Sequence, residues 1–481
     1  MKLAFLPYFF IACCLSFVNL AKADSLKLPE LGNSASSIVS LQQEYQLGQY
    51  WLRAFRQQAS LLDDPLLYTY VHGLIQSLAY YSPLEEKYFD LLLVDNTSFN
   101  AFAVPGHIIG VHSGLFLYAN TEDQLASVLT HEIAHLSQRH YARTLEQRRQ
   151  QNMLSLASLL GSLLIIAAGG GEAGIAALSA TQAAAISNQL RYSRIHEQEA
   201  DRVGIQTLAA AGMNPEAAAH MFQHLLILTR YRTDLKDFEF LMTHPIADSR
   251  VADALNLAKP YPRKVDKDGL DFHLMKVRVF FFYSKKPSDT EDFFRKNIAQ
   301  SKFPDAMRYG LALALLAQEK TAEAAPIIQT LHSDSPQQLA YKLAYLQLLA
   351  QQQQFEQAFS QGQLYLKLSP NSYAISMYLA ELYAKQHRYD DAVQILRRLS
   401  QSQWPDTPDV WLQLAEMEGM AGNIANVHLA RAEYFVRVGA FVQAQRQLSY
   451  AKPAFKDNVM ISSRIEVRMQ QIEQLKQNNP F

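Results

Sequence analysis

Residues 121–137 read TEDQLASVLTHEIAHLS, and the rest of the predicted fold is organised around this stretch. Thr121 and Gln124 have the spacing of a capping box, so we expect a helix to begin here and to run through both histidines. Four residues separate His131 from His135, which places the two imidazoles on one helix face, within reach of one ion. Glu132 stands beside them, where its carboxylate can polarise a water held at that ion. The stretch therefore predicts a metal-binding helix.

The pattern is the HExxH zincin signature, which predicts one Zn²⁺ per chain and Glu132 as the group that takes a proton from water. A catalytic zinc needs a third protein ligand, and Glu197 is the best candidate. Asp201 shares its helix face, four residues on, where it can support a histidine ligand or exchange protons near the site. His196 is a competing ligand, but adjacent helical positions point about 100° apart, so one of the two must turn away. Glu199 is expected to project into solvent.

Composition and the N-terminus limit the possible functions. The chain has 481 residues, 49% hydrophobic and 19% charged, which suits two or three globular domains, and its formal net charge of −1 argues against nucleic acid as a partner. Residues 1–23 resemble a secretory signal peptide cleaved after Ala23, so we expect a periplasmic protein. Both cysteines, Cys13 and Cys14, leave with it, which excludes thiolate ligands and cysteine nucleophiles. No later apolar stretch reaches spanning length, which disfavours an integral membrane protease.

Apolar spacing predicts a mainly α-helical catalytic domain, residues 24–262, with a small β-sheet between residues 88 and 115. Helices are expected over 36–81, where Asp64-Pro65 is typical of an N-cap followed by proline at the first helical position, and over 187–211, 216–230 and 248–257. Residues 154–185 are apolar and almost uncharged. They form either a packed helical hairpin or a surface that covers the active site or makes peripheral contact with a membrane, and the sequence leaves these alternatives open.

The C-terminal part repeats with a period of 34 residues, as the positions of Ala324, Ala358 and Ala392 show. This is the period of tetratricopeptide helix pairs, so we expect a zincin-type metallopeptidase domain followed by a tetratricopeptide α-solenoid. The repeats are assigned to residues 303–460, after a linker and bridging helix over 263–302 and before a C-terminal tail over 461–481. Such solenoids present concave surfaces to protein partners.

Several motifs resemble one enzyme family. The HExxH…ExxxD pattern of residues 131–135 and 197–201 is similar to that of the HtpX and CAAX-prenyl-protease family of metallopeptidases. Residues 100–106, NAFAVPG, resemble the strand ahead of the zinc helix in that family, with His107 where relatives commonly carry a second glycine. The segment from His244-Pro245 to Arg250 resembles the family's HPxxxxR element. The resemblance covers nearly the whole mature chain.

The resemblance implies zinc on His131, His135 and Glu197, with Glu132 as the catalytic base and Asp201 as a proton donor. A role in orienting one of the histidine ligands explains Asp201 equally well. Signal peptide, catalytic domain and repeats together resemble the family's periplasmic members. Their clients would be unfolded or misassembled envelope proteins, especially outer-membrane β-barrel proteins and their assembly machinery, at the inner face of the outer membrane.

Two further elements have candidate roles in the site. The strand Asn100, Ala101, Phe102 and Ala103 offers an edge to which an extended peptide could add as another strand, or it is an ordinary structural strand. His244 either occupies the open position of the metal and holds the enzyme closed, binds the tetrahedral intermediate, or caps a helix. Arg250 either stabilises the oxyanion or pairs with a carboxylate.

Two functions from different classes remain. The first is a zinc endopeptidase that degrades misfolded or stalled envelope proteins and also acts as a chaperone in β-barrel assembly. The second is a tetratricopeptide chaperone or scaffold with a latent or inactive metallopeptidase domain. Glu132→Gln separates them, because only a protease would lose its function.

Overall fold

The structure is a computed structural model that describes residues 39–147, 194–231, 238–265, 269–402 and 407–479. The predicted signal peptide (1–23) and the apolar segment 154–185 lie outside the described residues. The described part is mostly helical with a small three-stranded sheet, which confirms the predicted fold class. None of its helices combines the length and apolar character needed to cross a membrane.

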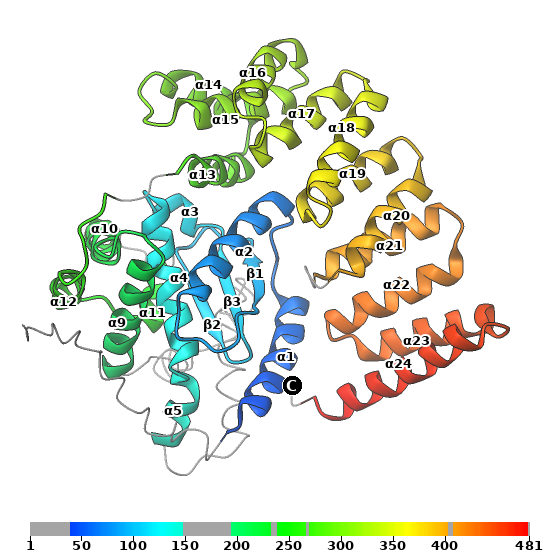
Figure 1. The fold of residues 1–481 in the computed structure, drawn as a ribbon, viewed down its shortest axis with the longest axis horizontal. Helices are drawn as coiled ribbons and strands as arrows, with labels where there is room; N and C mark the ends of the chain where they lie inside the picture. Colours follow the sequence, from blue (N-terminus) through cyan, green and yellow to red (C-terminus); the bar gives the residue numbers. More distant parts are fainter. Residues whose placement is uncertain (1–38, 148–193, 232–237, 266–268, 403–406, 480–481) are drawn as a thin grey trace, which may run out of the picture.

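The sheet contains β1 (Asp90–Val94), β2 (Ala101–Val104) and β3 (Ile108–His112) in the order β1-β3-β2. β3 runs parallel to β1 and antiparallel to β2, with Ala103 opposite Ile109. All residues of the three strands are buried, because helices cover the sheet (Figure 1). Because the strand order ends with β2, this strand forms one edge of the sheet within the described residues.

The turn between β2 and β3 packs directly against α1 (Leu41–Gln58). Gly106 and His107 have positive φ angles of 89° and 64°, so the histidine adopts the left-handed conformation that glycine adopts more easily. Gly48 lets the α1 backbone approach, since a methyl group there would lie 1.9 Å from the Pro105 carbonyl oxygen. Trp51, one turn further along α1, lies with its ring 5.9 Å from that of Phe102, so this helix anchors the β2–β3 hairpin.

α4 (Glu122–Ser137) crosses the middle of the domain, and every residue from Glu122 to His135 is buried. The Thr121 hydroxyl accepts a hydrogen bond from Gln124 N at 3.3 Å, but the Gln124 side chain accepts from Asn120 N, so only one half of the predicted capping box forms. α9 (Arg194–Ala210) packs tightly on α4 because Gly204 has no side chain; a methyl group there would lie 3.2 Å from His131 N. This approach brings the two metal-motif helices together.

The other helices of this domain surround α4. After the sheet, the chain forms α3 (Leu115–Tyr118), α5 (His140–Gln147), α10 (Ala217–Tyr231), α11 (Phe240–Thr243) and α12 (Asp248–Ala258) in addition to α4 and α9. Before the sheet, α2 (Pro65–Tyr80) begins as the sequence predicts, with Asp64 accepting hydrogen bonds from Leu66 N and Leu67 N.

The repeat region follows as an arc of antiparallel helices (Figure 1). The bridging element is a helix pair, α13 (Leu270–Tyr283) and α14 (Pro287–Asn297). The later helices are α15 (Pro304–Ala317), α16 (Thr321–Asp334), α17 (Leu339–Gln351), α18 (Phe355–Leu368), α19 (Tyr373–Lys385), α20 (Tyr389–Ser400), α21 (Pro408–Met420), α22 (Ile424–Arg437), α23 (Phe441–Ala451), η3 (Lys452–Phe455) and α24 (Val459–Gln477). Ala324, Ala358 and Ala392 are fully buried, as their 34-residue spacing predicts. Most of the predicted tail, however, is helical in α24.

The catalytic domain lies on the concave side of the arc (Figure 1). At the start of α2, Asp64 forms an ion pair with Arg278 of α13 at 2.7 Å. Tyr68 packs edge-on against Tyr373 of α19, with ring centroids 5.5 Å apart. At the end of α1, Gln57 donates a hydrogen bond to the Val438 carbonyl after α22, at 2.6 Å. The helical arc thus contacts the catalytic domain at its start in α13, in its middle at α19 and again after α22.

Candidate metal centre

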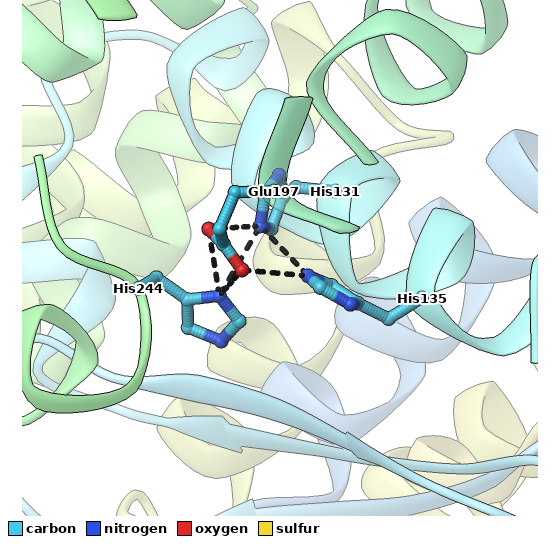
Figure 2. A group of neighbouring side chains, drawn as sticks. All are labelled: His131, His135, Glu197 and His244. Carbon is cyan, nitrogen blue, oxygen red and sulfur yellow. Dashed lines mark hydrogen bonds and ion pairs between the residues drawn. The ribbon is translucent and has the colours of Figure 1, made fainter. Parts of the chain in front are cut away.

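Four buried side chains from three elements converge at one point (Figure 2). His131 and His135 come from α4, Glu197 from α9, and His244 from the end of α11. The Nε2 atoms of His131 and His135 are 3.0 Å apart, and each lies 3.5 Å from a Glu197 carboxylate oxygen. His244 Nδ1 lies 3.0 Å from Glu197 Oε1 and 3.3 Å from His131 Nε2. All four ligand atoms fall within 4.8 Å of one another.

This arrangement fits a metal ion. In a tetrahedral zinc site with bonds of about 2.0–2.1 Å, ligand atoms lie about 3.3 Å apart, close to the separations found here. Three imidazole nitrogens and a carboxylate oxygen that face one another in the buried interior offer a divalent cation a complete set of ligands. A donor set of nitrogen and oxygen without sulfur suits zinc and other borderline divalent metals.

The pKa shifts of the site residues also favour a cation at this point. Burial alone would lower the pKa of His131, but hydrogen bonds and charges from Asp201 and Glu197 raise it to about 10. Burial and the neighbouring His131 charge hold the pKa of His135 well below its ordinary value. For Glu197, burial is outweighed by His244 and His131, which hold its pKa well below the ordinary range. The carboxylates therefore draw a cation to this point.

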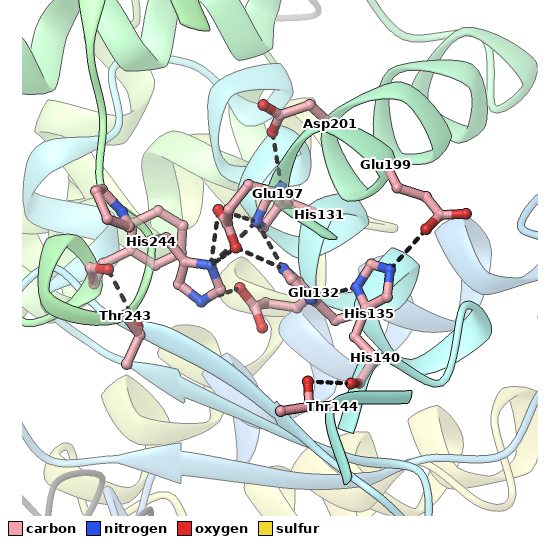
Figure 3. Close-up of polar contacts among 12 residues, drawn as sticks. His131, Glu132, His135, His140, Thr144, Glu197, Glu199, Asp201, Thr243 and His244 are labelled. Atoms are coloured by element: carbon pink, nitrogen blue, oxygen red, sulfur yellow. Dashed lines mark hydrogen bonds and ion pairs between the residues drawn. The ribbon is translucent and has the colours of Figure 1, made fainter. Parts of the chain in front are cut away.

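Glu132 lies beside the ligands, on the side of the sheet (Figure 3). It is buried, its Oε1 atom lies 3.6 Å from His244 Nε2, and it accepts a hydrogen bond from the backbone of Ala103 in β2. Burial raises the pKa of Glu132, and the nearby His244 and His131 act in the opposite direction. A carboxyl group with a raised pKa beside a metal centre has the properties of a general base that must also release its proton.

Asp201 and Arg250 lie behind the ligands. Asp201 Oδ1 is 3.0 Å from His131 Nδ1, and both Asp201 oxygens accept hydrogen bonds from the Arg250 guanidinium, at 2.7 and 2.9 Å. Arg250 Nη1 also lies 3.0 Å from Glu197 Oε2. Burial would raise the pKa of Asp201, but His131 and Arg250 lower it. Asp201 is thus placed to orient His131, and Arg250 to hold both carboxylates.

The other candidate residues differ in whether their side chains face the centre. His244 faces the centre, while its backbone N–H caps α11 by bonding the Phe240 carbonyl at 2.8 Å. The Asn100 side chain donates to Glu239 at 3.3 Å, and the Phe102 ring is buried in the core with Trp51. Arg250 pairs with carboxylates, which is one of the two alternatives that the sequence leaves open. His196 turns away from the centre and stacks on His140, with ring centroids 4.4 Å apart.

Two residues near the centre have roles that the sequence did not predict. His140, which the sequence patterns do not single out, is fully buried, and its Nδ1 lies 2.8 Å from His135 Nδ1. Glu199, expected to be solvated, binds His140 at 3.2 Å (Figure 3) and Arg143 at 2.7 Å. Burial lowers the pKa of His140, and together with His196 it brings that pKa to about 3. The spacing of His140 from the motif carries no helical signal, because α4 ends between them.

Comparison with known proteins places this geometry in a family. Residues 65–258 match Peptidase family M48, and residues 349–417 match the tetratricopeptide repeat. The β-barrel assembly-enhancing protease of Escherichia coli (strain K12) is 34% identical over 463 residues, which cover 95% of this chain and 93% of that protein. The putative β-barrel assembly-enhancing protease of Vibrio cholerae is 32% identical over 94% of this chain and 93% of its own length.

A more distant relative matches a shorter part of the chain. The mitochondrial metalloendopeptidase OMA1 of Saccharomyces cerevisiae is 28% identical over 173 residues, which cover 34% of this chain and 44% of that protein.

Proposed function

The chain belongs to the β-barrel assembly-enhancing proteases of Peptidase family M48, and is therefore a metalloendopeptidase; we propose that its metal is zinc and that it acts on envelope proteins in the periplasm. The observation that carries the proposal is the convergence of His131, His135 and Glu197 beside the buried Glu132. When bound, zinc would lower the pKa of water and polarise a carbonyl group.

The chain's own residues would divide the work of peptide hydrolysis. His131, His135 and Glu197 would hold the metal, while Asp201 fixes the His131 ring through its Nδ1 atom. Glu132 would take a proton from the attacking water and pass it to the leaving amine, a transfer that its raised pKa favours. Asp201 is a weaker candidate for proton donor, because the bonds to His131 and Arg250 already hold it as a carboxylate.

The substrate would add as a strand along β2. In an antiparallel pair, alternate residues direct their peptide groups to opposite sides, so Ala101 and Ala103 face away from β3. The Ala103 backbone already bonds Glu132, which places this edge next to the catalytic carboxylate. Pairing through the backbone suits unfolded segments of varied sequence. Asn100 and Phe102 would support the strand from behind.

His244 supports a closed resting form of the enzyme. Its Nδ1 atom lies among the ligand atoms, where it can fill the coordination position that a substrate or water needs. This contact also favours the second candidate function, a chaperone or scaffold with a latent peptidase. His244→Ala distinguishes the roles: relief of closure would speed cleavage of an unfolded model substrate such as casein, whereas loss of an oxyanion donor would slow it about 100-fold or more.

The repeat domain would recruit the clients. The proposed clients are misfolded or stalled outer-membrane β-barrel proteins and their assembly machinery, with chaperone activity as well as degradation. The signal peptide would direct export and be cleaved after Ala23, and residues 154–185 would provide any peripheral membrane contact. The names of the relatives and the tetratricopeptide repeats support this assignment.

Two measurements test the proposal. Elemental analysis of the purified mature chain should find about one zinc per chain, which His135→Ala and Glu197→Ala should lose or weaken. Glu132→Gln should keep the zinc and lose casein cleavage. A wild-type chain without zinc after reconstitution would refute the metal assignment. Full function of Glu132→Gln in β-barrel assembly would instead favour the scaffold.

A further inference from the structure

We propose that His140 is a positioning residue for metal binding: it relays the charge of Glu199 to His135, and so sets the tautomer and ring orientation of that ligand. The inference rests on the proposed zinc site and adds two residues to it. From the surface inward, Arg143 contacts Glu199. Glu199 contacts His140, which in turn contacts His135 (Figure 3).

Hydrogen-bond directions along this series of contacts follow from its outer end. Glu199 accepts from Arg143 at 2.7 Å, and an ionised carboxylate can only accept. His140 Nε2, 3.2 Å away, must therefore carry the proton and donate it to Glu199. A neutral His140 then has a bare Nδ1 atom, which accepts from His135 Nδ1 at 2.8 Å. His135 consequently keeps its proton on Nδ1 and presents the Nε2 lone pair to the centre.

The opposite assignment of protons would prevent His135 from binding the metal. If His140 donated from Nδ1, His135 Nδ1 would be the acceptor, and the His135 proton would sit on Nε2, facing His131 Nε2 at 3.0 Å. A protonated nitrogen cannot bind a metal. A doubly protonated His140 is disfavoured, because the ring is fully buried with Arg143 already paired to the same carboxylate.

The two histidine ligands thus receive different support. His131 contacts the carboxylate of Asp201 directly, at 3.0 Å. His135 reaches Glu199 only through the His140 ring, whose other face stacks on His196 at an interplanar angle of 13°. Stacking fixes the plane of His140, and the two hydrogen bonds fix its rotation in that plane. Outer partners of this kind typically contribute 10–100-fold to metal affinity.

The test compares two substitutions in the full chain. His140→Phe keeps a ring against His196 but removes the acceptor, so its zinc dissociation constant, measured by chelator competition, should rise about 10–100-fold. His140→Asn places an amide oxygen near the former Nδ1 position and should recover most of this loss. The visible spectrum of the Co²⁺-loaded protein should change in His140→Phe and return toward wild type in His140→Asn.

Two further variants complete the design. His112→Phe removes a buried histidine that bonds Ser98 at 2.8 Å, away from the centre, and should leave the zinc dissociation constant unchanged. Glu199→Ala removes the partly exposed outer carboxylate and should also weaken zinc binding, which keeps the proposal testable should His140→Phe not fold.

The outcomes separate the relay from the zinc site itself. Wild-type affinity in a folded His140→Phe would overturn the relay and leave the zinc site standing. Equal weakening in His140→Phe and His140→Asn, with Glu199→Ala unaffected, would also overturn it, since packing alone would then explain the loss. Absence of zinc from the wild type would overturn the metal assignment on which the relay depends.

Discussion

Replacement of Gly48 by alanine tests how the hairpin that carries β2 is held. Gly48 lies within α1, and helix propensity alone predicts that Gly48→Ala stabilises the protein by about 1 kcal/mol. The packing predicts the opposite sign. A methyl group at this position would lie 1.9 Å from the Pro105 carbonyl oxygen and 3.1 Å from Gly106 Cα.

The expected cost follows from these distances. A carbon and an oxygen atom need a little over 3 Å, so α1 would have to move about 1 Å away from a backbone that cannot rotate aside. Overpacking of this kind costs about 1–3 kcal/mol, and backbone contacts belong at the upper end. After subtraction of the gain in propensity, we expect Gly48→Ala to lower the free energy of unfolding by about 2 kcal/mol.

Gly73 provides the matched control, because it lies in the neighbouring helix α2 and an added methyl group there would meet nothing within 4 Å. Gly73→Ala should raise the free energy of unfolding by about 0.5–1 kcal/mol. Urea unfolding of metal-free protein, followed by circular dichroism and by tryptophan fluorescence, to which the buried Trp51 contributes, measures both variants. Stabilisation by Gly48→Ala equal to that of Gly73→Ala would refute the close approach of α1 and the hairpin.

Three further outcomes are expected. Burial raises the pKa of Glu239 from 4.5 to about 7, so between these pH values the folded state holds a proton that the unfolded state releases. The free energy of unfolding should therefore fall by up to about 3 kcal/mol as the pH rises from 4.5 to 7. Urea titrations of Glu239→Gln should lack this pH-dependent component. Arg250→Met removes the guanidinium from the buried Asp201 and Glu197 carboxylates and leaves them with histidine partners, so it should cost about 3–5 kcal/mol in metal-free protein, more than Arg250→Lys, by thermal melting. Removal of zinc by a chelator should lower the melting temperature, because free zinc at 100 times its dissociation constant adds about 2.7 kcal/mol; unchanged melting would argue against a zinc site.

Local patterns were sufficient for much of the fold. The 34-residue spacing of small residues predicted the solenoid because each helix pair repeats the same crossing, and Ala324, Ala358 and Ala392 are buried at those crossings. Asp64 and Pro65 marked the start of α2 because a helix end needs an acceptor for its free N–H groups. The end of the solenoid was less visible, since α24 packs through few apolar positions and has Ile465 and Ile472 as its buried residues.

The sequence by itself determined which side chains share a helix face: His131 with His135, and Glu197 with Asp201, because a helix returns to the same side every 3.6 residues. The tertiary structure alone decided what those faces meet. Gly204 lets α9 approach α4, His244 enters from a loop 113 residues after His131, and Arg250 turns to Asp201. His140 touches His135 only because the chain turns between α4 and α5, where Arg139 has a positive φ of 50°. Contacts of this kind depend on packing between elements distant in sequence or on a change of chain direction, and neither leaves a periodic trace in the sequence.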